Sequence, residues 1–124
     1  MAAHADLWGE IAPSAVRTPV SILREQASLL GSKTKNTIEG KVESRVSGSL
    51  LYHSFNLVVP ALDNYTYELF QISHDANLYP VHVERRSSYD ELRNEEAFVT
   101  WVGQKLSSAD TKGIIGNLLA QANS

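Results

Sequence analysis

The fold is decided by residues 50–84, which read LLYHSFNLVVPALDNYTYELFQISHDANLYPVHVE. Turn-forming residues divide this stretch at 60–64 (PALDN) and again at 75–77 (DAN). The three remaining pieces are rich in the β-branched and aromatic residues that are typical of strands. Because connections this short join neighbouring antiparallel strands, residues 50–59, 65–73 and 78–84 are predicted to form a meander.

A further strand is indicated just before this stretch. Val42 and Val46 alternate with Glu43 and Arg45, which is the pattern of a half-buried strand. Residues 47–49 (SGS) then form either a bulge or a tight turn. The sequence therefore predicts a sheet of three to four strands.

A helix is predicted on the N-terminal side of the sheet. Thr18 can cap it, and Pro19 then occupies the first helical position, where a missing N–H costs nothing. Gly31 is expected to end the helix. One apolar stripe at helical spacing supports this prediction: Ile22, Leu23, Ala27 and Leu30.

Two helices are predicted after the sheet. Ser88 and Glu91 form a capping box that opens the first, and Ser107 or Ser108 caps the second. The first helix carries an apolar stripe made of Tyr89, Leu92, Phe98, Val99, Val102 and Leu106. The predicted fold is thus α+β: an antiparallel β-meander packed with an N-terminal helix and two C-terminal helices.

The domain organisation expected from the pattern is simple. Residues 18–124 are expected to form a single domain, preceded by a partly flexible leader over residues 1–17. Leu7, Trp8 and Ile11 make part of that leader apolar enough to dock on the domain.

Composition excludes several classes of function. With no cysteine, the chain has no disulfide and no thiolate metal site. The N-terminus lacks the basic start of a signal peptide, and no apolar run approaches the roughly 18 residues of a membrane span. These features predict a cytoplasmic protein without a membrane partner.

The charge of the chain argues against nucleic acid as a partner. The formal net charge is −3, from 11 basic and 14 acidic residues. Basic residues gather locally, but without a basic helix face or interleaved aromatics. A solvated loop and an edge strand account for that local group, which is Lys33, Lys35, Lys41 and Arg45.

The expected strand register places side chains on the two faces of the sheet. Three pairs define it: Val59 with Tyr65, His53 with Gln71, and Ile72 with Val81. One face then carries apolar residues, namely Phe70, Ile72, Tyr79, Val81 and Val83. The opposite face carries a polar row across three strands, namely His53, Gln71, His82 and Glu84.

The histidines are not expected to converge on one site. His74 is predicted on the apolar face, away from His53 and His82, and those two are separated by a strand. No third metal ligand and no group that would orient a catalytic histidine is evident. The sequence therefore indicates no metal, cofactor or catalytic residue, and the polar row is a candidate for binding a small ligand.

The aromatic residues indicate a different kind of site. Tyr65 and Tyr67 share a face, with Phe55 and Leu57 nearby, and Trp101 lies at the margin of its helix stripe. Apolar residues are thus expected on both faces of the sheet, whereas the helices can cover only one face fully. Uncovered apolar surface on a small protein marks an interface with a partner or a second copy.

Two hypotheses of function follow. The first is a protein-interaction or regulatory module without catalytic activity, acting through the sheet and its edge, such as an accessory, inhibitor or immunity-type protein. The alternative is a small enzyme or ligand-binding protein that uses the polar row.

Overall fold

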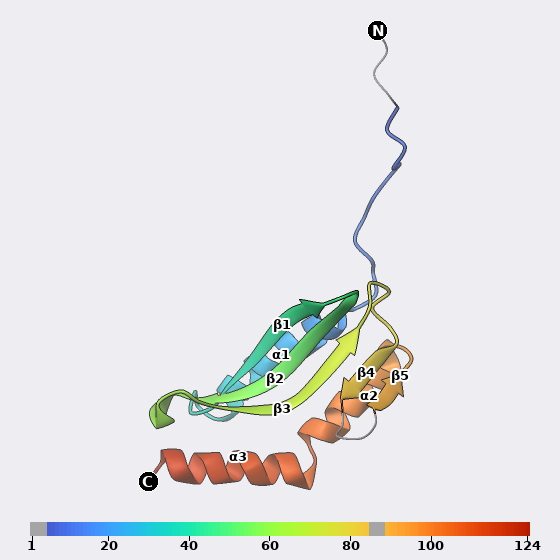
Figure 1. The fold of residues 1–124 in the computed structure, drawn as a ribbon. Helices are drawn as coiled ribbons and strands as arrows, with labels where there is room; N and C mark the ends of the chain where they lie inside the picture. Colours follow the sequence, from blue (N-terminus) through green and yellow to red (C-terminus); the bar gives the residue numbers. More distant parts are fainter. Residues whose placement is uncertain (1–4, 85–88) are drawn as a thin grey trace.

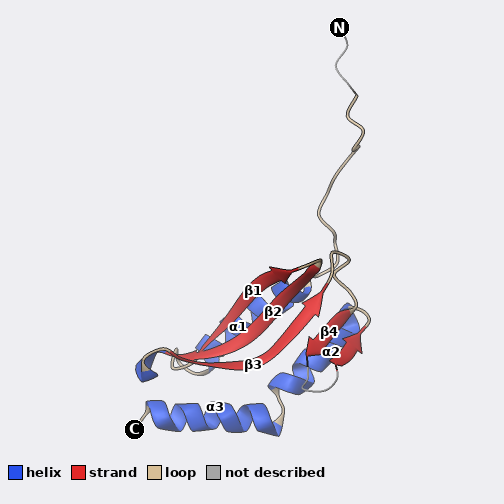
Figure 2. Ribbon diagram, in the orientation of Figure 1, coloured by secondary structure: helices blue, strands red, loops and turns tan. Residues whose placement is uncertain are grey.

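A computed structural model describes residues 5–84 and 89–124 (Figure 1). Helix α1 (Pro19–Lys33) precedes a five-stranded antiparallel sheet, and helices α2 (Glu95–Leu106) and α3 (Ala109–Ala122) follow it. The strands lie side by side in chain order (Figure 2): β1 (Glu39–Ser47), β2 (Leu50–Val59), β3 (Tyr65–His74), β4 (Val81–Glu84) and β5 (Tyr89–Leu92). The predicted α+β meander with one helix before it and two after it is confirmed, but it has five strands instead of three or four.

The fifth strand occupies residues that the sequence pattern assigned to a helix. Residues 89–92 pair with β4, so that Val81 faces Leu92, and α2 begins only at Glu95. Asn94 caps this helix, because its side-chain oxygen accepts a hydrogen bond from the Ala97 N–H at 2.8 Å. The predicted capping box involves Ser88, which lies outside the described residues.

The other helix caps agree with the sequence except at one end. The Thr18 and Ser108 side chains accept bonds from backbone N–H groups in the first turns of α1 and α3, as predicted. Helix α1, however, runs past Gly31 to Lys33. Left-handed backbone at Lys35 and Asn36 makes the reversal, and the Asn36 N–H donates to the Gly31 carbonyl at 2.7 Å.

A bulge in β3 decides which side chains share a face of the sheet. Phe55 pairs with Phe70, but the next residue, Asn56, pairs with Glu68, so Leu69 has no partner on β2. Successive side chains of a strand alternate between the two faces of the sheet. The extra residue therefore places the β3 side chains beyond it opposite different β2 residues, and on the other face relative to β2, than an unbroken ladder would. His53 consequently pairs with Ile72, and the predicted pairing with Gln71 is wrong. The predicted pairing of Ile72 with Val81 is wrong as well, because Ile72 pairs with Val83.

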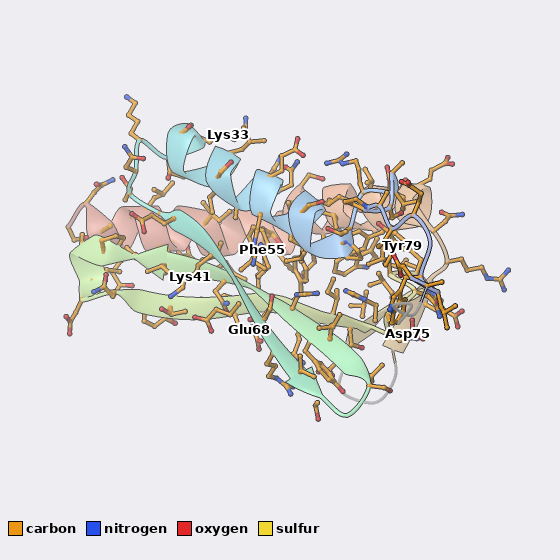
Figure 3. The ribbon with its side chains drawn as sticks, turned by 90° about the horizontal axis from the view of Figure 1, so that it is seen from above. Lys33, Lys41, Phe55, Glu68, Asp75 and Tyr79 are labelled. Atoms are coloured by element: carbon orange, nitrogen blue, oxygen red, sulfur yellow. The ribbon has the colours of Figure 1, made fainter. Side chains whose placement is uncertain are left out.

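All three helices cover the same face of the sheet, which we call the inner face (Figure 3). The core between the two layers draws buried side chains from every helix and from β2, β3 and β4. Its fully enclosed members include Leu23, Ile38, Phe55, Leu57, Ile72, Val81 and Phe98. The opposite, outer face is polar, with residues such as Lys41, Glu43, Ser54, Glu68 and Gln71.

Gly40 on β1 lies directly against the backbone of α1. A Cβ atom at this position would lie 2.6 Å from the Cα of Ala27 on α1. Since backbone cannot yield as a side-chain end can, we expect Gly40→Ala to lower the free energy of unfolding by about 1–3 kcal/mol. Gly113→Ala is the matched control, because no atom lies within 4 Å of its added Cβ.

In the control, a helical glycine becomes alanine without a clash, which should raise the free energy of unfolding by about 0.5–1 kcal/mol. Urea unfolding of both variants measures the two effects. Equal changes in the two variants would contradict the close contact between α1 and β1.

Candidate functional site

The bulge divides the predicted polar row between the two faces of the sheet. His53 lies on the inner face and is buried, with 4% of its surface exposed. Gln71, His82 and Glu84 remain together on the outer face, where the Gln71 side-chain amide donates to Glu84 Oε2 at 2.8 Å. The four candidates therefore do not form one site.

The structure instead brings two histidines together that the sequence separated. His53 Nε2 lies 2.9 Å from His74 Nε2, and the two rings stack with centroids 5.0 Å apart. His53 Nδ1 contacts the Ser44 hydroxyl at 2.7 Å, and His74 Nδ1 contacts the Asp75 carbonyl at 2.7 Å. The expectation that His74 lies on the face opposite His53 is wrong, because the bulge moves His53 to the face of His74.

The chain of contacts fixes the hydrogens when both rings are neutral. A carbonyl only accepts, so His74 must donate from Nδ1 to Asp75 and accept at Nε2. His53 then donates from Nε2 and accepts the Ser44 hydroxyl hydrogen at Nδ1. Every ring nitrogen of the histidine pair, His53 and His74, is thereby satisfied without a charge.

Electrostatics keep His53 in that neutral form. The pKa of His53 is lowered from 6.5 to about 4, mainly by burial and in smaller part by the neighbouring His74 and Arg24. A general base works best with a pKa near the operating pH, so His53 is poorly suited to activate Ser44 at neutral pH. The geometry supports a structural hydrogen-bond chain rather than a nucleophile and its base.

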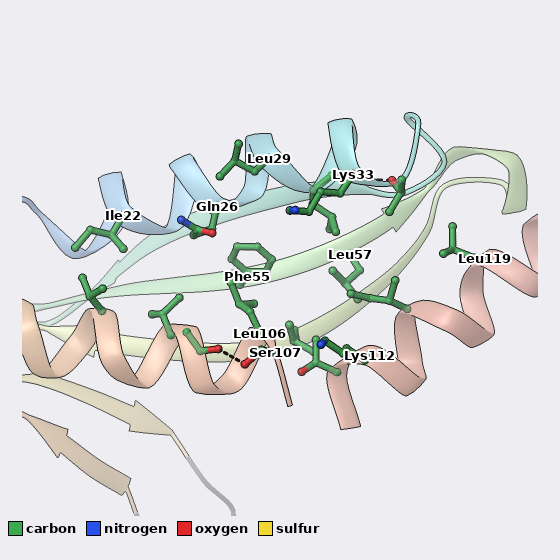
Figure 4. Close-up of a pocket in the computed structure, with 18 residues that line it drawn as sticks. Ile22, Gln26, Leu29, Lys33, Phe55, Leu57, Leu106, Ser107, Lys112 and Leu119 are labelled. Carbon is green, nitrogen blue, oxygen red and sulfur yellow. Dashed lines mark hydrogen bonds between the residues drawn. The ribbon is translucent and has the colours of Figure 1, made fainter. Parts of the chain in front are cut away.

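An apolar groove lies between α1 and the α2–α3 pair, over the inner face of the sheet (Figure 4). Its volume of about 630 Å³ falls within the range of ligand-binding pockets. We define the apolar groove by its apolar lining: Ile22, Leu29, Leu30, Phe55, Leu57, Leu69, Val99, Val102, Leu106, Ile115 and Leu119.

The charges around the apolar groove have one sign. Lys33 on α1 and Lys112 on α3 line the groove from opposite sides (Figure 4). The polar lining is completed by Gln26, Thr34, Ser107 and Thr111, and none of the acidic residues in the described part of the chain lines the groove. Although the net charge of the whole chain is −3, the charged residues that line the apolar groove are both lysines.

The predicted interface residues meet the groove only in part. Phe55 and Leu57 form its floor, but they are 1% and 0% exposed. Tyr65 and Tyr67 lie on the inner face as well, paired with Val59 and Leu57, and do not line the groove. The expectation of apolar surface on both faces is wrong.

Trp101 takes a different position from the other interface candidates. Its ring packs edge-on against Phe70, with centroids 4.9 Å apart. It lines a separate hollow beside β3 and β4, together with Glu84 and Asp90.

The groove could have been found only indirectly in the sequence. Val99 follows Phe98 in the helix stripe, and two neighbouring helical residues cannot both point at the same core position. Val99 is 41% exposed and Leu29 on α1 is 45% exposed, whereas Phe98 is fully buried. An apolar stripe wider than the core requires is the signal that reasoning from the sequence missed.

Other kinds of site find no support within residues 5–84 and 89–124. No helix there is long and apolar enough to cross a membrane. No three or more metal-ligating side chains gather there in a way that could hold a metal ion. Comparison of the chain with protein-family models, with curated proteins and with solved structures gave no significant match.

Proposed function

We propose that this protein is a non-catalytic interaction module that binds an acidic, apolar peptide segment of a partner protein in the apolar groove. The observation that carries the proposal is a groove with an apolar floor and lysines on opposite walls, without any acidic lining residue. The proposed interaction surface is therefore the apolar groove, and not the sheet and its edge as the sequence pattern predicts.

The exposed apolar side chains support a peptide as the ligand. Leu29 and Val99 lie at the groove with 45% and 41% of their surfaces exposed, whereas the apolar residues of the core are buried. Exposed apolar surface of this kind gains free energy when an apolar face covers it. A hydrophobic groove between helices is a known type of surface for binding the apolar side chains of a peptide segment.

The lysines support an acidic segment. Lys33 and Lys112 would each pair with a carboxylate of the ligand at the edge of the groove. Such exposed pairs contribute only about 0.2–1 kcal/mol each, so they select and orient the segment while apolar burial supplies most of the affinity.

Selection from a displayed library of random peptides tests this proposal. We expect the enriched peptides to combine large apolar residues with Asp or Glu. The double variant Lys33→Glu with Lys112→Glu should weaken their binding about tenfold, because two attractions become repulsions.

The control is Lys41→Glu with Arg45→Glu, which changes the net charge equally but on the outer face of β1. The enriched peptides should bind this control as tightly as they bind the unmodified protein. Peptides that bind equally well to both double variants, or a selection that yields no binder, would overturn the proposal.

A further inference from the structure

The N-terminal arm, residues 5–16, has the composition that the apolar groove would select. Its large apolar residues are almost fully exposed: Leu7 at 93%, Trp8 at 81% and Ile11 at 74%. The docking of these residues on their own domain that the sequence allowed is therefore not seen. Four of the eight large hydrophobic residues that are exposed in the described part of the chain lie in this arm, and two more, Leu29 and Val99, line the groove.

The charges of arm and groove are complementary. Asp6 and Glu10 flank the Leu7–Trp8 pair, and residues 5–16 contain no basic residue. The groove carries Lys33 and Lys112 and no acid. An acidic segment with bulky apolar residues thus exists within the same chain as a basic groove with an apolar floor.

The root of the arm fixes the direction in which it leaves the domain. The Arg17 backbone N–H donates to Glu95 Oε1 at 3.0 Å, and the Arg17 carbonyl accepts from the Tyr79 hydroxyl at 2.9 Å. The Arg17 guanidinium also pairs with Glu25 at 2.6 Å. From this anchored residue the arm runs away from the sheet and helices (Figure 1), with no described contact to the groove of its own domain.

We infer that the N-terminal arm of one copy occupies the apolar groove of a second copy. A fully extended arm of this length spans roughly 40 Å, enough to cross to a neighbouring domain and lie along its groove. Reciprocal exchange would bury Leu7, Trp8 and Ile11 together with Leu29 and Val99 in both copies. This inference rests on the proposed function, since it names the segment that the groove takes.

Mixing two full-length variants tests the exchange by sedimentation. The arm variant carries Leu7→Ser, Trp8→Ser and Ile11→Ser and keeps its groove. The groove variant carries Leu29→Asp and Val99→Asp and keeps its arm. Neither variant changes a buried core residue, so both should fold.

We expect the unmodified protein to sediment as a dimer at high concentration, each variant alone as a monomer, and their equimolar mixture as a dimer. A synthetic peptide of residues 5–16, labelled with a fluorophore, should bind the arm variant and lose about tenfold or more in affinity for the groove variant.

A monomeric unmodified protein would overturn the exchange, as would a dimer that survives in either variant. A monomer that binds the synthetic peptide only after its own arm is altered would place the arm in the groove of its own copy. If random acidic peptides bind the groove but the arm peptide does not, this inference fails while the proposed function stands.

Discussion

Replacing Phe98 by alanine is expected to lower the free energy of unfolding by about 3–5 kcal/mol, the usual cost of deleting an enclosed aromatic side chain. Phe98 lies in α2 with none of its surface exposed, and its ring contacts Tyr79 at a centroid distance of 6.4 Å. Alanine would leave a cavity where α2 meets the chain that leads into β4. Urea unfolding followed by circular dichroism measures the loss.

Val99→Ala is the matched control, one residue further along the same helix. Val99 is 41% exposed at the groove, so truncation removes little buried surface, and alanine favours a helix more than valine does. We expect a change of less than about 1 kcal/mol in either direction. Similar losses for Phe98→Ala and Val99→Ala would mean that α2 does not face the sheet as described.

The elements with local signals could be predicted from the sequence. Thr18 followed by Pro19 and Ser108 before Asp110 define helix starts through backbone bonds within one turn. The two turns of the meander at residues 60–64 and 75–77 are equally local. Such signals depend only on neighbours in the chain, and they are the parts of the prediction that the structure confirms.

The errors come from non-local choices. Residues 89–92 carry Glu91 and an apolar Leu92, a pattern that suits a helix start as well as a strand. These residues form a strand because they pair with β4, where Val83 is opposite Asp90 and Val81 is opposite Leu92. The local sequence of residues 89–92 does not predict this pairing with β4.

One bulge accounts for the misplaced candidate site. Without the extra Leu69, the parity of the ladder puts His53, Phe55 and Leu57 on the face opposite Phe70. With it, all four share the inner face, so the polar row divides and the apolar surface gathers on one side. A single extra residue in β3 thus moved the β2 side chains to the other face relative to Phe70, while Gln71, His82 and Glu84 still share one face as expected.

The histidine pair makes stability depend on pH in a defined window. In the folded protein the pKa of His53 is lowered to about 4, against 6.5 for the exposed group. Between these values the unfolded chain binds a proton at His53 and the folded chain does not. Stability therefore rises with pH across the window and is lost as the pH falls from 6.5 to 4.

The expected loss from this group is about 3 kcal/mol, since each pH unit of the difference corresponds to about 1.4 kcal/mol. His53 is 4% exposed, so solvent screens the effect little. Urea unfolding at intervals between neutral pH and pH 4 measures the total slope. His53→Gln removes the titrating group. Over the same pH window we expect the free energy of unfolding of this variant to fall by about 3 kcal/mol less than that of the unmodified protein.

His82→Gln is the control for this comparison, because it changes a histidine of β4 on the outer face of the same sheet. Because this variant keeps His53, its stability should still fall as the pH drops from 6.5 to 4. The imidazole resonances of His53 give a direct reading, since they should show a neutral ring down to nearly pH 4. A His53 ring that titrates near 6.5, or equal slopes for His53→Gln and the unmodified protein, would contradict a buried, neutral His53. The same result would remove the reason for assigning Ser44, His53 and His74 to structure, because a histidine with an ordinary pKa beside an exposed serine could serve as its base.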